Sequence, residues 1–430
     1  MTDIARRVYN HNWKIDPIIR SLIDTDFYKL LMCQSVYRHN ANVQVAFSLI
    51  NRSKTIPMAD LIDEGELREQ LDHARTLRLS PGESTWLRGN MFYGKRQMFQ
   101  PDFMEWFENM RLPAYHLERH GDQYELTFEG SWPEVMLWEV PALAILMELR
   151  SRTVLKGMGR FELQVLYARA TTRLWEKIEH LQKIDDLALA DFGTRRRHSF
   201  LWQDWCVQAM IEGLGGKFTG TSNCLIAKRH EVEAIGTNAH ELPMVYAALA
   251  KSDTELRDAP YKVLQDWQAD HDSNLLIILP DTYGTKGFLD NAPDWLSKWT
   301  GIRIDSGDPV KGAEMAINWW RERGEDPTQK RVIFSDGLDV AEIERLAGLF
   351  QGRVKTAFGW GTLMTNDFRG LVKDDALAPF SVVCKAVSAN GAPTVKLSDN
   401  PKKAMGPADE IERYKRVFKL GAQDSMDVLV

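Results

Sequence analysis

Seven polar turns, each placed between an apolar β-like run and a helix-like stretch, recur in the second half of this 430-residue chain. They are DFGTRRR (191–197), TGTSN (219–223), IGTNAHE (235–241), LPDTYGTKG (279–287), IRIDSGDP (302–309), IFSDGLD (333–339) and FGWGTLM (358–364). Repeated strand–turn–helix units predict a parallel sheet. Seven units in about 175 residues favour a closed barrel, and the short, polar strands predict an irregular one. The turns that follow barrel strands share one end, so we expect all seven to meet around one site.

The first part of the chain has a different pattern. Residues 42–50 predict a strand, 58–77 an amphipathic helix, 115–130 a hairpin and 132–152 an apolar helix. Residues 381–399 predict a final hairpin-like segment. We therefore expect an α/β protein with an N-terminal α+β domain over 1–155. An irregular (β/α) barrel over 156–430, carrying the C-terminal hairpin, would form the second domain.

Charge and cysteine usage exclude several classes of protein. The formal charge is −6 and the sequence pI about 6.0, which argues against a general nucleic-acid surface. The four cysteines are scattered and form no C-x-x-C pair, so free thiols in a reducing cytoplasm are expected. No secretory h-region and no run of 18 apolar residues occurs, so we expect a cytoplasmic protein without a membrane span.

His240 lies in the turn GTNAHE, directly before Glu241. Metal ligation is disfavoured because no H-x-x-H or H-E-x-x-H pattern is present. A structural role is the ordinary outcome for one histidine at a turn. A base or a nucleophile would need an orienting carboxylate, which Glu241 or a strand-end aspartate could supply.

Four other turns carry candidate ligand contacts. Arg303 and Asp305 are two apart on a strand, so they point to the same side, although a structural ion pair explains such a pair equally well. Asp336 could accept from sugar hydroxyls or cap a helix. In FGWGTLM, two glycines and a threonine could cradle a phosphate or simply form a tight turn. The three arginines of DFGTRRR at a helix start oppose the helix dipole, which hints at a nearby anion.

Taken in order, DTDFYK, DFGTRRR, GTSN, GTNAHE, IDSGDP, FSDGLD and FGWGT resemble the nicotinate phosphoribosyltransferase family, over residues 21 to about 400. GTRRR and KLSDNPKK (396–403) are most similar to its bacterial branch. The resemblance implies a type II phosphoribosyltransferase fold and a homodimer with a shared active site. It also implies synthesis of nicotinate mononucleotide from nicotinate and phosphoribosyl pyrophosphate, coupled to ATP hydrolysis as in a ligase, as the first step from nicotinate to NAD.

The same resemblance implies roles for individual residues. His240 matches the histidine that ATP phosphorylates, with Glu241 or a strand-end carboxylate orienting it and Asp305 accepting from the sugar. Tyr28, expected from the other subunit, and Phe192 match the aromatic pair around the pyridine ring. The implied substrate-binding set is Tyr28, Phe192, Arg195, Ser222, Thr237, Arg303, Asp336, Gly359, Gly361, Thr362, Lys385 and Lys396, with Arg52 as a weaker candidate. The metal ligands stay undetermined, although Asp281 and Asp305 could hold Mg²⁺ through water.

Relatives that prefer nicotinamide carry an acidic residue where this chain has Ser222. A serine can donate to a carboxylate, whereas an aspartate would repel it, so nicotinate is the expected substrate. The alternatives are a nicotinamide- or quinolinate-using enzyme, a barrel aldolase or epimerase acting on phosphosugars, and a catalytically inactive binding protein.

Overall fold

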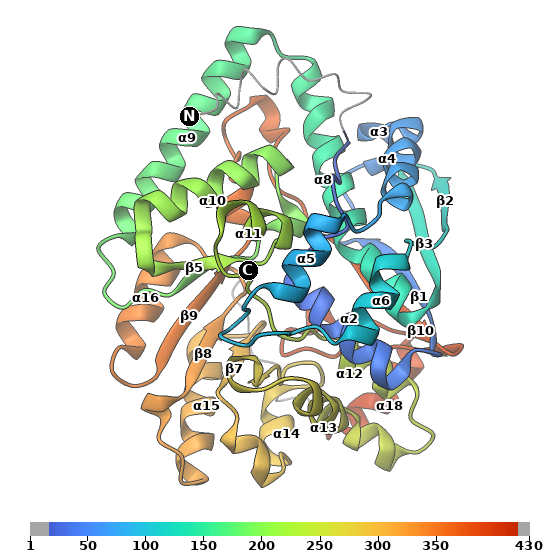
Figure 1. Cartoon of the computed structure of the whole chain (residues 1–430), viewed down its shortest axis with the longest axis vertical. Coiled ribbons are helices and arrows are strands. Elements are labelled where there is room, and N and C mark those ends of the chain that lie inside the picture. Colours follow the sequence, from blue (N-terminus) through green and yellow to red (C-terminus); the bar gives the residue numbers. More distant parts are fainter. Residues whose placement is uncertain (1–16, 420–430) are drawn as a thin grey trace.

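Two β-sheets organise the computed structural model, which describes residues 17–419 (Figure 1). The parallel sheet has the order β5-β4-β9-β8-β7-β6. Its strands are β4 (Leu189–Asp191), β5 (Phe218–Thr221), β6 (Ile277–Ile278), β7 (Gly301–Ile304), β8 (Arg331–Phe334) and β9 (Lys355–Trp360). The antiparallel sheet has the order β11-β10-β1-β3-β2. Its strands are β1 (Gln44–Asn51), β2 (Tyr115–His120), β3 (Gln123–Ser131), β10 (Val382–Ala389) and β11 (Ala392–Pro393). The predicted mixed α/β class with a parallel sheet is confirmed.

Helices cover both sheets. In the first part they are α2 (Phe27–Asn40), α3 (Met58–Leu61), α4 (Glu64–Thr76), α5 (Pro81–Gly89), α6 (Pro101–Asn109), α7 (Trp132–Val135), α8 (Glu139–Lys156) and α9 (Arg160–Leu181). The others are α10 (Phe200–Leu214), α11 (Cys224–His230), α12 (Glu241–Ala248), α13 (Asp253–Asp270), α14 (Thr285–Asp290), α15 (Pro309–Glu322), α16 (Val340–Phe350), α17 (Thr362–Thr365) and α18 (Ala408–Val417). None of the helices in the described residues is long and apolar enough to cross a membrane.

An irregular segment, residues 232–239, bridges the two edges of the parallel sheet. The backbone of Thr221 in β5 exchanges hydrogen bonds with Glu233 and Ile235. The side chain of Asn238 donates to the carbonyl of Ile277 in β6 at 3.0 Å. The expected irregular barrel therefore takes the form of six paired parallel strands and one bridging segment, and that segment leads directly into His240.

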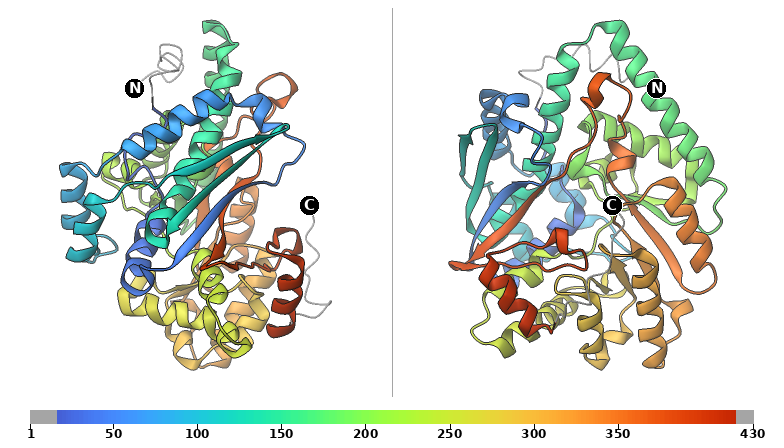
Figure 2. Two further views of the ribbon diagram at one scale, coloured as in Figure 1. Left: turned by 90° about the vertical axis from the view of Figure 1, so that its right-hand side faces the viewer. Right: turned by 180° about the vertical axis from the view of Figure 1, so that it is seen from behind.

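The antiparallel sheet combines strands from both sides of the predicted boundary at residue 155. β10, from the C-terminal hairpin, pairs with β1 along almost its whole length. The two views of Figure 2 show these strands lying side by side, and both α8 and α12 pack against β10. As a result, the C-terminal part of the chain is placed against the N-terminal part, next to the ends of the barrel strands.

The helix predicted over 58–77 is divided in two, which corrects the sequence-based expectation. Ile62 adopts an extended conformation, and the Asp63 side chain accepts from the backbone N–H of Glu66, which starts α4 as a new helix. The local capping preference of an aspartate thus interrupts an apolar periodicity that continues across the break. The hairpin predicted over 115–130 is confirmed by β2 and β3.

Candidate active site

A cavity of about 440 Å³ lies where the carboxyl ends of the parallel strands face the antiparallel sheet. Of the residues proposed from sequence, it is lined by Tyr28, Arg52, Phe192, Arg195, Ser222, Thr237, His240, Arg303, Asp305, Asp336, Gly359, Gly361, Thr362, Lys385 and Lys396. Parallel strands that share a direction bring their following turns to one end, which explains why turns far apart in sequence converge here. Glu241 and Asp281 do not line the cavity, although Asp281 lies close behind it.

Tyr28 reaches the cavity from the same chain as Phe192, so the expectation that it comes from a second subunit is not met. Its helix, α2, begins at Phe27, whose N–H donates to the carbonyl of Ser222. The helix also passes close to Gly236, where a β-carbon would stand 2.6 Å from the backbone nitrogen of Tyr28. Only a glycine permits that approach, so the GTNAHE turn and α2 are packed together within one protomer.

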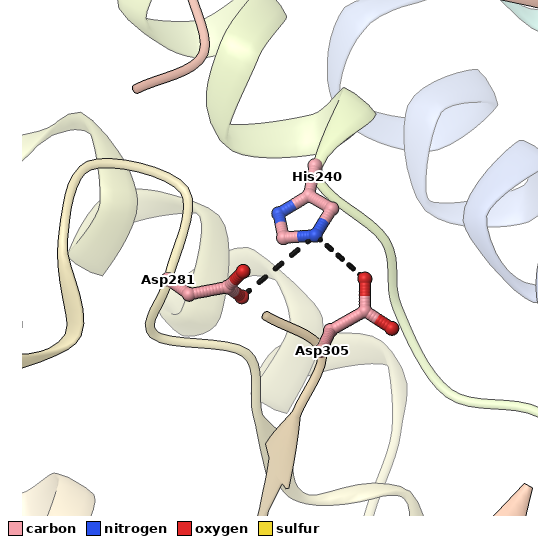
Figure 3. A group of neighbouring side chains, drawn as sticks. All are labelled: His240, Asp281 and Asp305. Carbon is pink, nitrogen blue, oxygen red and sulfur yellow. Dashed lines mark hydrogen bonds and ion pairs between the residues drawn. The ribbon is translucent and has the colours of Figure 1, made fainter. Parts of the chain in front are cut away.

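His240 is held by two side chains, Thr282 and Asp305, and approached by a third, Asp281. Figure 3 shows the two aspartates on one side of the ring. Its Nδ1 lies 3.0 Å from Thr282 Oγ1, and its Nε2 lies 3.0 Å from Asp305 Oδ2 and 3.7 Å from Asp281 Oδ1. Burial, followed by the nearby charge of Lys396, lowers the pKa of His240 to about 4, so the ring is neutral at physiological pH. Since an ionised carboxylate only accepts, the Nε2–H donates to Asp305 and the Thr282 hydroxyl donates to Nδ1.

The carboxylate of Glu241 points away from His240, which corrects the orienting role predicted for it. Glu241 Oε1 accepts from the indole of Trp132 at 2.8 Å, and its Oε2 forms a buried ion pair with Lys29. Glu241 is the first residue of α12, and successive helical residues point in different directions. The orienting carboxylate is therefore the strand-end residue Asp305.

Arg303, on β7, and Asp305, directly after its end, both face the cavity, as their spacing of two residues predicts. They are only loosely paired, because Arg303 Nε lies 3.9 Å from Asp305 Oδ1 and has no hydrogen-bond partner in the described chain. Burial alone would raise the pKa of Asp305, but Arg303 and His240 hold it well below its usual value. Lys396 is 5% exposed, and its amine makes no hydrogen bond within residues 17–419. Two buried cations with unused donors thus face the cavity, as an anionic ligand would require.

The hydroxyl of Ser222 donates to Asp26 Oδ1 at 2.6 Å rather than pointing freely into the cavity. Asp26 also lies 3.4 Å from Arg195 Nε, and its side chain makes no capping hydrogen bond to α2 although it directly precedes that helix. Burial raises the pKa of Asp26. A serine has a single O–H, so Ser222 cannot donate to Asp26 and to a substrate carboxylate at the same time.

The three arginines of DFGTRRR have different surroundings. Arg195 and Arg196 line the cavity, whereas Arg197 is fully buried and paired with Asp24 at 2.6 and 2.9 Å. They belong to a 3-10 turn, and the following helix α10 begins only at Phe200. Only the first two arginines are therefore available to an anion.

His198 follows this turn and provides a test of pH dependence. It is fully buried, lies 2.9 Å from the hydroxyl of Tyr167, and burial lowers its pKa to about 3. The pKa of a histidine in an unfolded chain is near 6.5, so between pH 6.5 and 3 this residue is protonated in the unfolded chain but not in the folded chain. Stability should therefore fall with decreasing pH, by about 2 kcal/mol between pH 6.5 and 5 from this residue.

Urea unfolding at the two pH values checks this prediction. The variant His198→Gln should lose about 2 kcal/mol less than the wild type over the interval. His116→Gln, which changes an exposed histidine on β2, is the matched control and should behave as the wild type. Identical losses for His198→Gln and the wild type would contradict the assignment.

Asp336 and the late glycine turn also reach the cavity. Asp336 Oδ2 accepts from Lys403 at 2.6 Å, and the cap of α16 is Asp339, so Asp336 is not the helix cap. Gly359 lies within β9, and Gly361 directly precedes the four-residue helix α17. The phosphate-cradle interpretation of this turn stays a prediction.

The sequence interpretation missed four charged residues of the site: Asp26, Lys29, Glu139 and Lys403. One signal could have revealed Glu139, because it stands in the otherwise apolar segment MLWEVPALAILM. A carboxylate in an apolar helix is buried only when it is paired, so such a residue indicates a nearby cation.

His240, Asp281 and Asp305 could also hold a metal ion. Their candidate ligand atoms lie within 4.8 Å of one another, and Asp281 Oδ1 is buried without a hydrogen-bond partner in the described chain. Two carboxylates are hard oxygen donors of the kind that Mg²⁺ prefers. The residues therefore fit the magnesium ion that the sequence resemblance implies.

Comparison with known proteins gives matches along most of the chain. Residues 187–422 match the profile described as the nicotinate phosphoribosyltransferase (NAPRTase) family, and residues 23–147 match that of its N-terminal domain. A nicotinate phosphoribosyltransferase structure from Vibrio cholerae is similar at a TM-score of 0.84 and 29% identity, with 95% of each chain covered. One from Porphyromonas gingivalis is similar at 0.82 and 27% identity, covering 94% of this chain and 100% of the other.

Proposed function

This chain belongs to the nicotinate phosphoribosyltransferase family, and from that premise we propose that it makes nicotinate mononucleotide from nicotinate and phosphoribosyl pyrophosphate. The observation that carries the proposal is the single cavity, which joins aromatic side chains, cations and glycines from turns far apart in the sequence. A flat anionic ring and a phosphorylated sugar are the ligands that such a lining suits.

The ring would lie between the side chains of Tyr28 and Phe192, with its carboxylate near Arg303. In the reaction, the pyridine nitrogen forms a bond to C1 of the ribose while the bond from C1 to the pyrophosphate oxygen breaks. The nitrogen attacks with its own lone pair, so no general base is needed. Positioning, and stabilisation of the oxocarbenium-like centre by a carboxylate such as Asp305, would supply the acceleration.

The phosphates would be held by cations and backbone donors around the cavity. Lys385, Lys396, Arg195 and Arg52 would face the pyrophosphate, and the turn with Gly359, Gly361 and Thr362 would face the 5′-phosphate. Burial lowers the pKa of Lys396 to about 8, and an anionic ligand would favour its charged form. The leaving pyrophosphate would then depart from an environment that already balances its charge.

We further propose that His240 accepts the γ-phosphoryl group of ATP. A bond forms between the ring nitrogen Nε2 and phosphorus, the bond from phosphorus to the β,γ-bridging oxygen breaks, and ADP leaves with the electron pair. In the resting site the proton is on Nε2, so attack by Nε2 requires that the proton first moves to Nδ1. The Thr282 hydroxyl can accept as well as donate, so it supports this second tautomer, in which Nε2 is free to attack. Water later takes the phosphoryl group, which releases phosphate and restores His240. The low pKa of His240 keeps the ring unprotonated for this role.

Mg²⁺ would be held by Asp281 and Asp305, where it would neutralise phosphate oxygens. The chain's own contribution is the orientation of His240 by Asp305 and Thr282. A homodimer and a cytoplasmic location stay predictions. A second copy is not needed to bring Tyr28 to the cavity, because one chain places it there.

Mass spectrometry tests the proposal directly. Purified protein is incubated with nicotinate and phosphoribosyl pyrophosphate, with and without ATP, and nicotinate mononucleotide is quantified. Intact-protein mass under ATP alone should show one added phosphoryl group. If product forms but the protein is never phosphorylated, the phosphohistidine proposal is wrong and the transferase assignment is retained. If no product forms, the transferase assignment itself is overturned.

The Ser222–Asp26 contact predicts how substrate choice responds to substitution. Ser222→Asp places a second carboxylate against buried Asp26 and beside the carboxylate of the ligand. We expect kcat/KM for nicotinate to fall about a hundredfold, and that for nicotinamide to fall much less, because only nicotinate adds a further negative charge. Ser222→Asn, similar in size but uncharged, is the matched control and should affect the two substrates alike. Equal losses for both substrates in Ser222→Asp would contradict this explanation of specificity.

A further inference from the structure

Glu139 is a buried carboxylate that receives four donors at one wall of the cavity. It is the first residue of α8 and is 2% exposed. Its Oε1 lies 3.3 Å from Arg195 Nη1 and 3.3 Å from Lys385 Nζ. Its Oε2 lies 2.6 Å from Lys29 Nζ and accepts from the hydroxyl of Tyr28 at 3.3 Å. Three of these four donors belong to residues that line the cavity, so one carboxylate joins an aromatic face and two cations.

The charges around Glu139 balance within a small buried cluster. Its cations are Lys29, Arg195 and Lys385, and its carboxylates are Glu139, Glu241 and Asp26. Burial would raise the pKa of Glu139, but Lys29, Lys385 and Arg195 outweigh it and keep the pKa well below its usual value. Glu139 is therefore ionised, and without it two cavity cations would face each other with no shared counter-charge.

We infer that Glu139 is a positioning residue for the phosphoribosyl-transfer reaction. Its carboxylate fixes the ring of Tyr28 and directs Arg195 and Lys385 into the cavity. The inference rests on the proposed function, since it assigns those three side chains to the substrates. Glu139 acts through them. Tyr28 has a freely rotating ring and Lys385 a long flexible stem, so an anchor at the polar end of each restricts their motion before the ligands arrive.

Lys29 provides the means to separate this role from a purely structural one. Glu139→Gln alone leaves three cations against two carboxylates, which should clearly lower the thermal unfolding temperature, as when one partner of a buried pair is removed. The double variant Glu139→Gln/Lys29→Met leaves two cations and two carboxylates, so part of that stability should return, although Glu241 loses the cation with which it is paired. It also leaves the net charge next to the cavity unchanged, so the field on an anionic ligand changes little.

The test compares stability and kinetics in these variants. For the double variant we expect thermal unfolding between that of Glu139→Gln and that of the wild type, a KM for nicotinate raised at least about tenfold, and kcat changed less than about threefold. Tyr28→Phe removes only the hydroxyl that Glu139 receives and should raise the KM about threefold. Added to the double variant, it should have no further effect, because the anchor is already gone.

Calorimetric titration with inorganic pyrophosphate gives a readout that does not depend on turnover. Its affinity should fall about fivefold in the double variant, because Arg195 and Lys385 are no longer directed together. A folded double variant with wild-type KM and wild-type pyrophosphate affinity would overturn the inference. If the wild type makes no nicotinate mononucleotide, the proposed function fails instead, and the pyrophosphate titration still decides whether Glu139 directs the two cations.

Discussion

Replacing His240 by alanine should abolish phosphorylation of the protein by ATP and reduce nicotinate-dependent ATP hydrolysis at least about a thousandfold. His240 is the only histidine of the described chain that lines the cavity, and the methyl group of alanine has no atom that could carry the phosphoryl group. Synthesis of nicotinate mononucleotide without ATP should continue slowly, because the pyridine nitrogen and the sugar do not use His240 as a base. Phosphate release and product formation, measured in parallel, check both halves of this expectation.

His230→Ala is a suitable control for the loss of a histidine. Its Nε2 lies 3.0 Å from the carboxylate of Asp204, as that of His240 does from Asp305, but His230 is outside the cavity. This variant should keep full ATP coupling. Full ATP coupling in His240→Ala would instead show that His240 does not accept the phosphoryl group.

The second large effect is expected from Gly359→Ala. A β-carbon at Gly359 would stand 2.4 Å from two ring carbons of Phe192, much closer than carbon atoms approach. The ring must move, and it would leave the position from which we propose that it stacks on the pyridine ring. Because stacking of an aromatic base is worth about 1–3 kcal/mol, we expect the KM for nicotinate to rise at least about tenfold.

Gly348→Ala gives the matched comparison, since its added β-carbon meets no heavy atom within 4 Å. It lies in α16, where alanine favours helix formation more than glycine does, so stability should rise slightly and the KM should stay constant. Steady-state kinetics and thermal unfolding of both variants decide the prediction. An unchanged KM in Gly359→Ala would show that Phe192 does not hold the ring.

The composition of the site was largely predictable from local patterns. Arg303 and Asp305 point to the same side because residues two apart on a strand must do so. The turns carrying Ser222, His240 and Thr362 meet because parallel strands end at one edge. Helix boundaries were harder to predict. The break before α4 is an example, because one capping aspartate starts a new helix although the apolar stripe continues across the break.

The partner of each charged side chain could not be predicted in the same way. Glu241 follows His240 in sequence, yet it pairs with Lys29, 212 residues away. Nothing in the sequence near Ser222 indicates a hydrogen-bond partner for its hydroxyl, yet the hydroxyl donates to Asp26, 196 residues away. Tyr28 was assigned to a neighbouring subunit, and only the packing of α2 against the turn at Gly236 places it in its own chain's cavity.

By itself, the sequence of this protein determined which turns converge and which chemical groups they bring, because strand alternation and the direction of a parallel sheet are set by local periodicity and by right-handed connections. Only the tertiary structure decided how those groups are paired. The free energy of a buried charge depends on which counter-charge packs within a few ångströms of it, and that distance is set by residues more than a hundred positions away, as between Lys29 and Glu139.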